Sequence, residues 1–260
     1  MRRLMLAAVL LASIAMAEVR PVAQATAELR VVTYNIKHGR GMDDRVDLDR
    51  TAAVLRPRQP DIVGLQEVDD RATRSGGVAQ AEHLGRLLGL RHAFGQFMAF
   101  QGGGYGLAVL SRHPIARVDP VRLPDGNEPR VALAVEIRPA EGPAFTVVNV
   151  HFDWVRDDGF RFAQATALTA YLDALKMPFL LLGDFNDVPD SRTLALFRAR
   201  ATEAAKPEGG RFTFSSTQPD KEIDYIFFSP AAMFGVREVR VIDERVASDH
   251  RPVLAVLTRR

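Results

Sequence analysis

The sequence predicts an α/β fold of the α+β kind, in which two mixed β-sheets pack face to face with the helices outside them. Predicted strands outnumber predicted helices along the 260 residues. Many neighbouring strands have connections too short for a helical crossover, which argues against a purely parallel, doubly wound sheet. The chain contains no Gly/Ser/Pro-rich linker and no internal repeat. One domain is therefore expected.

Strands are predicted where short runs of β-branched or other apolar residues occur. The run at 29–34 alternates along its length, whereas the run at 179–182 is uniformly apolar and follows Pro178, as expected for a fully buried strand. In chain order the predicted strands are 29–34, 61–65, 105–111, 131–137, 144–150, 179–182, 223–228, 236–242 and 252–257.

Helices are predicted from apolar spacing and from residues that start or stop a helix. Asp47 can cap the helix at 47–56, which Pro57 and Pro60 close. A second helix at 78–90 closes near Gly89. The longest helical pattern runs from 157 to 176, and a further helix at 190–200 is capped by Asp190 or Ser191. The glycine-rich segment 101–104 is expected to be a flexible loop.

Residues 1–25 have the form of a secretory signal peptide. Arg2 and Arg3 precede an apolar stretch at 4–17, and Ala15-Met16-Ala17 or Ala23-Gln24-Ala25 would be the cleavage site. The alternative is an uncleaved membrane anchor, but the apolar run is shorter than the roughly 20 residues of a membrane span. A secreted or periplasmic protein is expected. The chain has no Cys and hence no disulfide.

Composition and charge bear on the partners. With 47% hydrophobic and 25% charged residues, the composition is that of an ordinary globular protein. The formal charge of +2 falls to zero on removal of Arg2 and Arg3 with the signal peptide. Nucleic-acid binders usually show a clear basic excess, so nucleic acid is a possible but disfavoured partner. No obligate protein partner is evident, and a membrane surface could be met through a lipid substrate.

Polar residues recur where apolar strands end. The clearest case is Gly183-Asp184-Phe185-Asn186-Asp187, which directly follows the buried strand at 179–182. Carboxylates delivered by a buried strand need partners, although an Asx-rich turn before a helix is an alternative explanation. Asn35, Glu67, His151 and Asp153 likewise follow predicted strands, whereas Asp224 lies inside one and Asp249 and His250 immediately precede one. Because neighbouring strand ends can meet in one cleft, these groups could converge.

The residue types suit hydrolysis of phosphate esters. Carboxylate and carbonyl oxygens suit Mg²⁺, with Mn²⁺ or Ca²⁺ possible, and an Asp-His pair can orient an imidazole that activates water. The absence of Cys and of a His-x-x-x-His pair disfavours structural zinc. The chain also lacks a Gly-x-Ser-x-Gly elbow, a P-loop and a dinucleotide-binding fingerprint.

Seven short motifs occur in a fixed order that resembles the endonuclease/exonuclease/phosphatase superfamily, which includes pancreatic-type deoxyribonuclease. The motifs are Thr33-Tyr34-Asn35-Ile36, Gly64-Leu65-Gln66-Glu67-Val68, Leu110-Ser111-Arg112-His113-Pro114-Ile115, Asn149-Val150-His151-Phe152, Gly183-Asp184-Phe185-Asn186, Ile223-Asp224-Tyr225-Ile226 and Ser248-Asp249-His250-Arg251-Pro252. The resemblance implies a four-layer α-β-β-α sandwich over a single domain at 26–260, with the active site at one edge of the two sheets.

The same resemblance implies roles for matched residues. Glu67 would be the principal metal ligand, with Asn35 beside it and Asp249 sharing the metal. His250 would be the general base, oriented by Asp224. The remaining implied roles are positioning of water and phosphoryl oxygens by Asp184 and Asn186, and contact with the phosphate near the leaving group by His151. Whether Asp184 or His250 takes the water's proton stays open.

Other residues carry weaker indications. Asp153, Arg130 and Tyr105 are candidate substrate-binding residues, with turn capping, a surface ion pair and core packing as their respective alternatives. Trp154 is either a substrate platform or packing of the cleft wall. Asp187 is expected to begin a turn and to stay outside the catalytic set.

The expected function is a secreted, Mg²⁺-dependent phosphodiesterase or phosphatase acting on a small molecule or a lipid headgroup. Near-zero charge and the aromatic and glycine residues of segment 96–105 favour this substrate class. The motif order also resembles secreted bacterial members of the superfamily. A secreted nuclease for DNA or RNA is the alternative enzyme, and an inactive binding module on the same scaffold is the alternative of another class.

Overall fold

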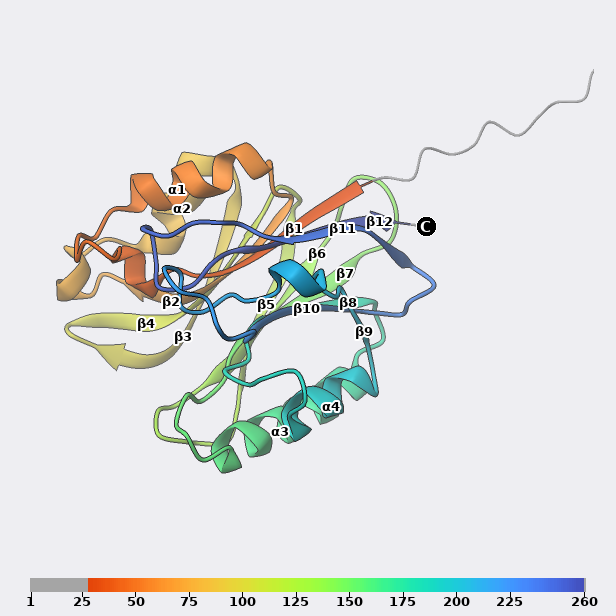
Figure 1. The fold of residues 1–260 in the computed structure, drawn as a ribbon. Helices are drawn as coiled ribbons and strands as arrows, with labels where there is room; N and C mark the ends of the chain where they lie inside the picture. The colour runs from red at the N-terminus through yellow and green to blue at the C-terminus, as the bar shows by residue number, and fades with distance from the viewer. Residues whose placement is uncertain (1–27, 260) are drawn as a thin grey trace, which may run out of the picture.

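Two six-stranded mixed sheets form the centre of the molecule in a computed structural model, which describes residues 28–259 (Figure 1). The first sheet has the order β11-β12-β1-β2-β4-β3, and its strands are β1 (Glu28–Asn35), β2 (Ile62–Asp70), β3 (Arg91–Phe100), β4 (Gly103–Ser111), β11 (Phe234–Val241) and β12 (Val253–Arg259). The second has the order β5-β6-β7-β8-β10-β9, and its strands are β5 (Ile115–Arg122), β6 (Val131–Ile137), β7 (Phe145–His151), β8 (Phe179–Asp184), β9 (Thr202–Glu203) and β10 (Asp224–Ser229).

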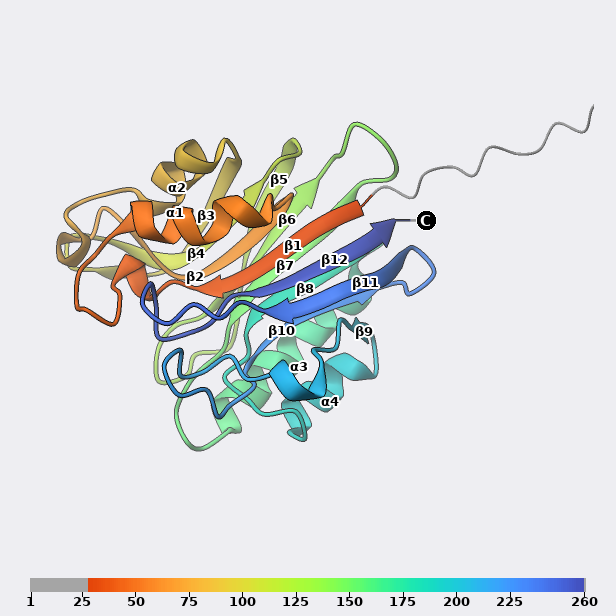
Figure 2. The ribbon, with the colours of Figure 1, turned by 45° about the horizontal axis from the view of Figure 1, so that its top comes forward.

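Helices cover both outer faces of this pair of sheets. Figures 1 and 2 show α1 (Leu48–Leu55) and α2 (Gln80–Leu88) over the first sheet, and α3 (Gly159–Ala174) and α4 (Arg192–Arg198) over the second. The fold prediction of an α-β-β-α sandwich is confirmed. The predicted signal peptide lies outside the described residues. Among residues 28–259, no helix combines the length and apolar character that a membrane span requires.

The alternation of side chains along each strand builds three apolar layers. In β1, Val31 packs between the two sheets, whereas its neighbour Val32 packs beneath α1 and α2. In β8, Leu180 and Leu182 face the other sheet while Leu181 faces α3 and α4. Strands buried on both faces need apolar residues at successive positions. This requirement explains the uninterrupted apolar runs in the sequence.

Each sheet has one parallel strand pair at its centre, and these pairs determine where the functional side chains lie. β1 and β2 run parallel in the first sheet, and β7 and β8 run parallel in the second. The other pairings are antiparallel within the described part of the chain. Asn35 at the end of β1 contacts Asp184 at the end of β8. The carboxyl ends of the parallel pairs therefore meet at one edge of the sandwich.

Several element boundaries differ from the sequence prediction. Segment 101–104 is not a flexible loop: Gln101 and Gly102 form a tight turn with positive φ, and Gly103 already belongs to β4. β3 and β5 were not predicted, because the small residues of β3 weaken its alternation of apolar and polar positions and β5 is an exposed edge strand that contains Pro120. The short strand β9 was missed as well.

The helix starts follow the predicted capping chemistry. Asp47 accepts a hydrogen bond from the backbone N–H of Arg50 at 2.8 Å and so caps α1. Of the two candidates for the cap of α4, Ser191 is the one that accepts, from Leu194 N at 3.2 Å. Each such cap satisfies a backbone donor that the helix itself leaves unpaired.

Gly183 permits the close approach of β8 to β7 just before Asp184. Its φ is +146°, and a Cβ there would overlap the backbone carbonyl oxygen of Val150. We expect Gly183→Ala to lower the free energy of unfolding by about 1–3 kcal/mol, because the backbone of β7 or β8 must move. Urea unfolding measures the change. Gly209→Ala is the matched control, since a Cβ at Gly209 meets nothing within 4 Å; equal effects of both substitutions would contradict the expectation.

Candidate active site

A cavity of about 600 Å³ opens at the edge where the parallel strands end. Most of the predicted site residues line it, and these are Glu67, Tyr105, Arg130, His151, Asp184, Asn186, Asp249 and His250. Asn35 and Asp224 lie buried directly behind the lining and contact it through hydrogen bonds. Residues from both sheets thus converge on one cavity, as the positions of the strand ends predicted.

Glu67 reaches the cavity through a β-bulge in β2. The register of β2 against β4 shifts between Leu65 and Val68, so that one extra residue is accommodated. Glu67 itself has a φ of +56°, a conformation that few non-glycine residues adopt. A bulge re-aims the side chain it carries. Glu67 was expected just beyond the strand, but it lies within β2 at this irregularity.

Asn149 of β7 supports this bulge from the opposite sheet. Its Nδ2 donates to the carbonyl oxygens of Leu65 and Ala108, both at 2.9 Å, and its Oδ1 accepts from Gln66 Nε2 at 2.7 Å. The side chain is fully buried between the sheets, where it shares a small polar network with the buried Gln66 and Thr33. Asn149 had no predicted role. The sequence does show Asn149 as an amide within an apolar strand, and such a group needs hydrogen-bond partners when it is buried.

We expect Asn149→Ala to lower stability and to weaken the site at the same time. Without Asn149, the buried carbonyl oxygens of Leu65 at the bulge and of Ala108 on β4 lose an amide donor, which costs about 1–3 kcal/mol of stability. The backbone that directs Glu67 then loosens. Urea unfolding and Mg²⁺ titration measure the two effects. Val147→Ala, on the same face of β7, removes only apolar contacts. Unchanged Mg²⁺ affinity in Asn149→Ala, or equal loss in both variants, would contradict this role.

Asp184 lies at the centre of the polar cluster. Its Oδ2 accepts from Asn35 Nδ2 at 3.1 Å, and the Nε2 atoms of His151 and His250 lie 3.5 and 3.6 Å from the same oxygen. Its Oδ1 accepts from the backbone N–H of Asn186 at 2.9 Å. Asn186 has a φ of +50° and donates its Nδ2 to Phe152 O, which holds the turn after β8 against the end of β7.

His250 and Asp224 form a buried hydrogen-bonded pair. His250 Nδ1 and Asp224 Oδ2 are 3.0 Å apart, so the Nδ1–H donates to the carboxylate. Lys206 donates to the backbone oxygen of Asp224 at 2.8 Å, and Thr213 Oγ1 accepts from its backbone N–H at 3.3 Å. Ser248 fixes the chain before His250 by donating to Asn35 O at 2.7 Å. Lys206, Thr213 and Ser248 had no predicted role, because their contacts are to backbone atoms distant in sequence.

The burial of these groups changes their protonation. Burial disfavours the imidazolium of His250, but the carboxylates of Asp224 and Asp184 outweigh burial and raise the pKa of His250 to about 10. Burial raises the pKa of Asp184 to about 7. Burial, reinforced by the positive charge of Arg130, lowers the pKa of His151 well below its usual value. A charged and a neutral imidazole therefore flank the same carboxyl group at neutral pH.

The cluster has carboxylate oxygens that could bind a hard divalent cation. One amide group, Asn35 Nδ2, lies 3.1 Å from both Glu67 Oε1 and Asp184 Oδ2. No ion pair of Glu67 with Lys or Arg occurs between residues 28 and 259, whereas Asp249 pairs with Lys37 at 2.8 Å. Among the described residues, the carboxylate of Glu67 thus has one neutral hydrogen-bond donor and no cationic partner. This arrangement fits a divalent cation held by Glu67 with Asn35 and Asp249 beside it.

Asp184, Asp224 and His250 form a second set of potential metal ligands. One ligand atom from each lies within 4.8 Å of the others. Asp224 does not line the cavity, however, and the hydrogen bond to His250 already engages both of their facing atoms. This geometry suits orientation of the imidazole and transfer of a proton better than binding of an ion.

The structure separates the three weaker candidates. Tyr105 and Arg130 both line the cavity. Arg130 is fully buried and pairs at 2.9 Å with the partly exposed Glu128, so it combines the predicted position at the cavity with the predicted pairing to an acid near the surface. Asp153 does not line the cavity. Its carboxylate accepts from the backbone N–H groups of Asn127 and Val155, which corrects its predicted contact with substrate. It serves as an anchor of the surrounding loops.

Asp187, which was expected to stay outside the site, lines the cavity and is buried. Its Oδ1 accepts from Val188 N at 3.0 Å, as a turn residue would. Its Oδ2 lies 3.4 Å from Arg161 Nε. Arg161 also lines the cavity and had no predicted role. The sequence feature that could have indicated it is its position as an arginine in the first turn of the longest predicted helix.

The chain is similar to proteins of known sequence over most of its length. The uncharacterized protein YbhP of Escherichia coli K12 is 27% identical over 250 residues, which cover 87% of this chain and 94% of YbhP. A UPF0294 protein of Vibrio campbellii is 27% identical over 175 residues, covering 63% of this chain and 58% of that protein.

Solved structures show the same architecture. An endonuclease/exonuclease/phosphatase from Beutenbergia cavernae superposes with a TM-score of 0.78 at 27% identity, covering 89% of this chain and 72% of that chain. The mannosyl-6-phosphatase Bt3783 of Bacteroides thetaiotaomicron superposes with a TM-score of 0.74 at 20% identity, covering 88% and 99% respectively. The second likeness concerns the fold alone.

A family model connects these similarities to the motifs of the site. The model described as the Endonuclease/Exonuclease/phosphatase family matches residues 32–250. That range contains all the residues that converge on the cavity, from Asn35 in β1 to His250 before β12. The chain therefore belongs to the endonuclease/exonuclease/phosphatase family, whose members hydrolyse phosphoric esters.

Proposed function

We propose that this protein is a Mg²⁺-dependent hydrolase of phosphoric esters in which a small molecule is the leaving group. The observation that carries the proposal is the convergence of Glu67, Asp184 and the Asp224–His250 pair, from both sheets, on one cavity. An inactive binding module would not require a buried carboxylate paired with a buried imidazole beside further carboxylates, because each such group is costly without partners.

In the proposed reaction, the attacking water lies between Asp184 and His250. Asp184 Oδ2 and His250 Nε2 are 3.6 Å apart on the cavity wall, so one water can contact both. Because His250 is already protonated at neutral pH, the water's proton passes to Asp184. Asp224 fixes the ring of His250 through Nδ1. Asn186 and His151, which also line the cavity, would donate hydrogen bonds to phosphoryl oxygens.

Enzymes of this family generally use divalent metal ions. A Mg²⁺ held by Glu67, with Asn35 and Asp249 beside it, would supply Lewis-acid stabilisation of the charge on the phosphoryl oxygens. Mn²⁺ and Ca²⁺ also prefer oxygen ligands. Activity in EDTA equal to that in Mg²⁺ would contradict the metal requirement.

The size of the cavity favours a small substrate. A volume of about 600 Å³ lies within the range of roughly 300–1,000 Å³ that is typical of small-molecule sites. Carboxyl groups of Glu128 and Asp187 stand among the basic residues of the lining, so the wall is not uniformly positive. Nucleic-acid sites depend on a positive surface that follows the phosphate backbone.

A panel of substrates tests this proposal. Purified full-length chain is incubated with Mg²⁺, Mn²⁺, Ca²⁺ or EDTA and plasmid DNA, RNA, sphingomyelin, phosphatidylinositol, glycerol 3-phosphate or bis(p-nitrophenyl) phosphate. We expect metal-dependent turnover of the small esters and little cleavage of duplex DNA. Cleavage confined to DNA or RNA would overturn the substrate class, and the nuclease alternative would then hold.

A further inference from the structure

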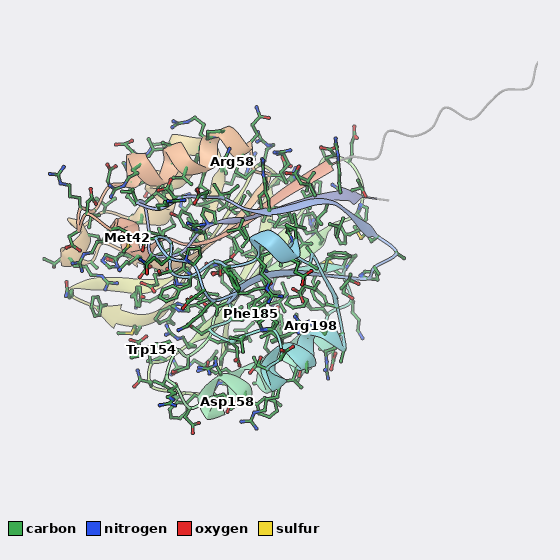
Figure 3. The ribbon with its side chains drawn as sticks, viewed as in Figure 1. Met42, Arg58, Trp154, Asp158, Phe185 and Arg198 are labelled. Atoms are coloured by element: carbon green, nitrogen blue, oxygen red, sulfur yellow. The ribbon has the colours of Figure 1, made fainter. Side chains whose placement is uncertain are left out.

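Trp154 is a large apolar side chain left exposed at the cavity. It is the only Trp among the 260 residues, it is 59% exposed, and it lines the cavity from the segment between β7 and α3. Figure 3 shows it on the same side of the molecule as Met42, where the loops leave the sheets. A Trp side chain that is mostly exposed contributes little to the stability of the hydrophobic core. Its position at the mouth of the site therefore needs another explanation.

The backbone on both sides of Trp154 is fixed by buried charged residues. Arg161 Nη1 donates to the carbonyl oxygens of Asp153 at 3.0 Å and of Val155 at 2.7 Å. Asp153 Oδ1 accepts from Val155 N at 3.1 Å. Arg161 and Asp153 are themselves buried. The indole is thus presented by an ordered segment, which reduces the entropy that a ligand must overcome to bind there.

A second wall of the cavity is tied to the same anchor. Arg161 Nε lies 3.4 Å from Asp187 Oδ2, and the adjacent Val188 is 48% exposed and lines the cavity. The exposed side chains of Arg156 and Lys221 complete this part of the lining. The cavity that Trp154 lines therefore also carries hydrogen-bond donors and carboxylate acceptors.

We propose that Trp154 is a stacking platform for a polyhydroxylated ring, a sugar or a cyclitol, in the leaving group of the substrate. This inference rests on the proposed hydrolysis at the neighbouring cluster. The C–H face of such a ring can cover the indole, while its hydroxyl groups can accept from Arg156 and Lys221 and donate to Asp187. An acyl chain would instead desolvate these charged groups without pairing them.

Fluorescence tests binding independently of turnover, because Trp154 is the sole Trp. Full-length His250→Ala protein with Mg²⁺ is titrated with glucose 6-phosphate, myo-inositol 1-phosphate, glycerol 3-phosphate and adenosine 5′-monophosphate. We expect a saturable change in Trp emission with at least one of the two ring phosphates at about tenfold lower concentration than with glycerol 3-phosphate, the scale of a stacking contact. Equal responses to the ring and acyclic phosphates, or tightest binding of the nucleotide, would overturn the proposal.

Steady-state kinetics of Trp154 variants provide a second test of the stacking platform. For the ring substrates, we expect Trp154→Ala to lower kcat/KM by about tenfold and Trp154→Phe to retain most of the activity, because Phe preserves a stacking face. Glycerol 3-phosphate should change by less than about twofold in both variants, since it has no ring to stack. Equal losses for ring and acyclic substrates would show a structural role and overturn the proposal.

The two proposals can fail separately. Turnover of glycerol 3-phosphate without any preference for a ring would sink the stacking platform and leave the hydrolase standing. A ring-specific change in Trp emission without turnover of any phosphate ester would sink the hydrolase and leave the platform standing.

Discussion

Replacing His250 by alanine is expected to lower kcat for the best phosphate ester by about 100-fold or more, the range for the loss of a proton-transferring group. The ring of His250 is held at Nδ1 by Asp224 and presents Nε2 to Asp184 at the cavity. Steady-state kinetics with Mg²⁺ measure the effect. His92→Ala is the matched control, because His92 is exposed on β3 and remote from the cavity lining. Retention of full activity in His250→Ala would rule out the proposed mechanism.

Asp184 and His250 are expected to depend on each other in the transfer of the water's proton. Because the proposed water contacts both groups, removing either one disables proton transfer, and removing the second adds little. We therefore expect the double variant Asp184→Asn, His250→Ala to lose about as much activity as the worse single variant. A double variant whose loss equals the product of the two single losses would show that the groups act independently.

Glu67→Gln is expected to weaken Mg²⁺ binding and to lower activity together. The substitution removes one negative charge from the residue that the β2 bulge directs into the cavity, while the shape of the side chain is kept. Calorimetric titration with Mg²⁺ measures the affinity, and we expect it to fall by about tenfold or more, the change that 1.4 kcal/mol produces. Activity should recover in part at high Mg²⁺.

Glu82→Gln, an exposed substitution on α2, is the control for the loss of one carboxylate. If Glu67→Gln bound Mg²⁺ as tightly as the control does, Glu67 would not be a metal ligand. If Glu67→Gln kept its affinity but lost activity, the residue would act on the substrate instead. Either result would mean that other residues of the cluster bind the cation.

The sequence predicted the location of the site because the chemistry follows the ends of apolar strands. The run Phe179–Leu182 could be recognised from its composition alone, and it delivers Asp184 to the edge of the second sheet. Burial on both faces makes such strands uniformly apolar, so a polar residue at their end stands out. The pairing of Asp224 with His250 is implied by the family resemblance, and a carboxylate within an apolar strand needs such a partner; the two side chains lie 3.0 Å apart.

The supporting contacts could not be predicted because they join residues that are distant in the chain. Asn149 and the carbonyl oxygen of Leu65 are 84 residues apart, and nothing local to either position indicates that they meet. The bulge at Glu67 depends on the pairing of β2 with β4, which no short window of sequence specifies. For Asp153 the sequence leaves substrate contact and turn capping open, and its hydrogen bonds to Asn127 N and Val155 N correspond to the second.

Two strands were not predicted because their local sequence does not have the pattern of a strand, although their tertiary environment makes them one. β3 buries Ala93, Gly95 and Phe97 on one face, but its small residues make the alternation weak. β5 is an exposed edge strand, so its sequence is polar at most positions. Both strands owe their conformation to pairing with β4 and β6 rather than to local propensity.

Hydrolysis in ¹⁸O-labelled water tests whether the residues gathered around Asp184 activate water for attack on phosphorus. The full-length protein is incubated with Mg²⁺ and the best ester of the substrate panel, and both products are analysed by mass spectrometry. We predict that the ¹⁸O enters the phosphate-containing product only, and that incorporation is lost in EDTA and in His250→Ala. Incorporation into the alcohol, or undiminished incorporation in His250→Ala, would contradict the account.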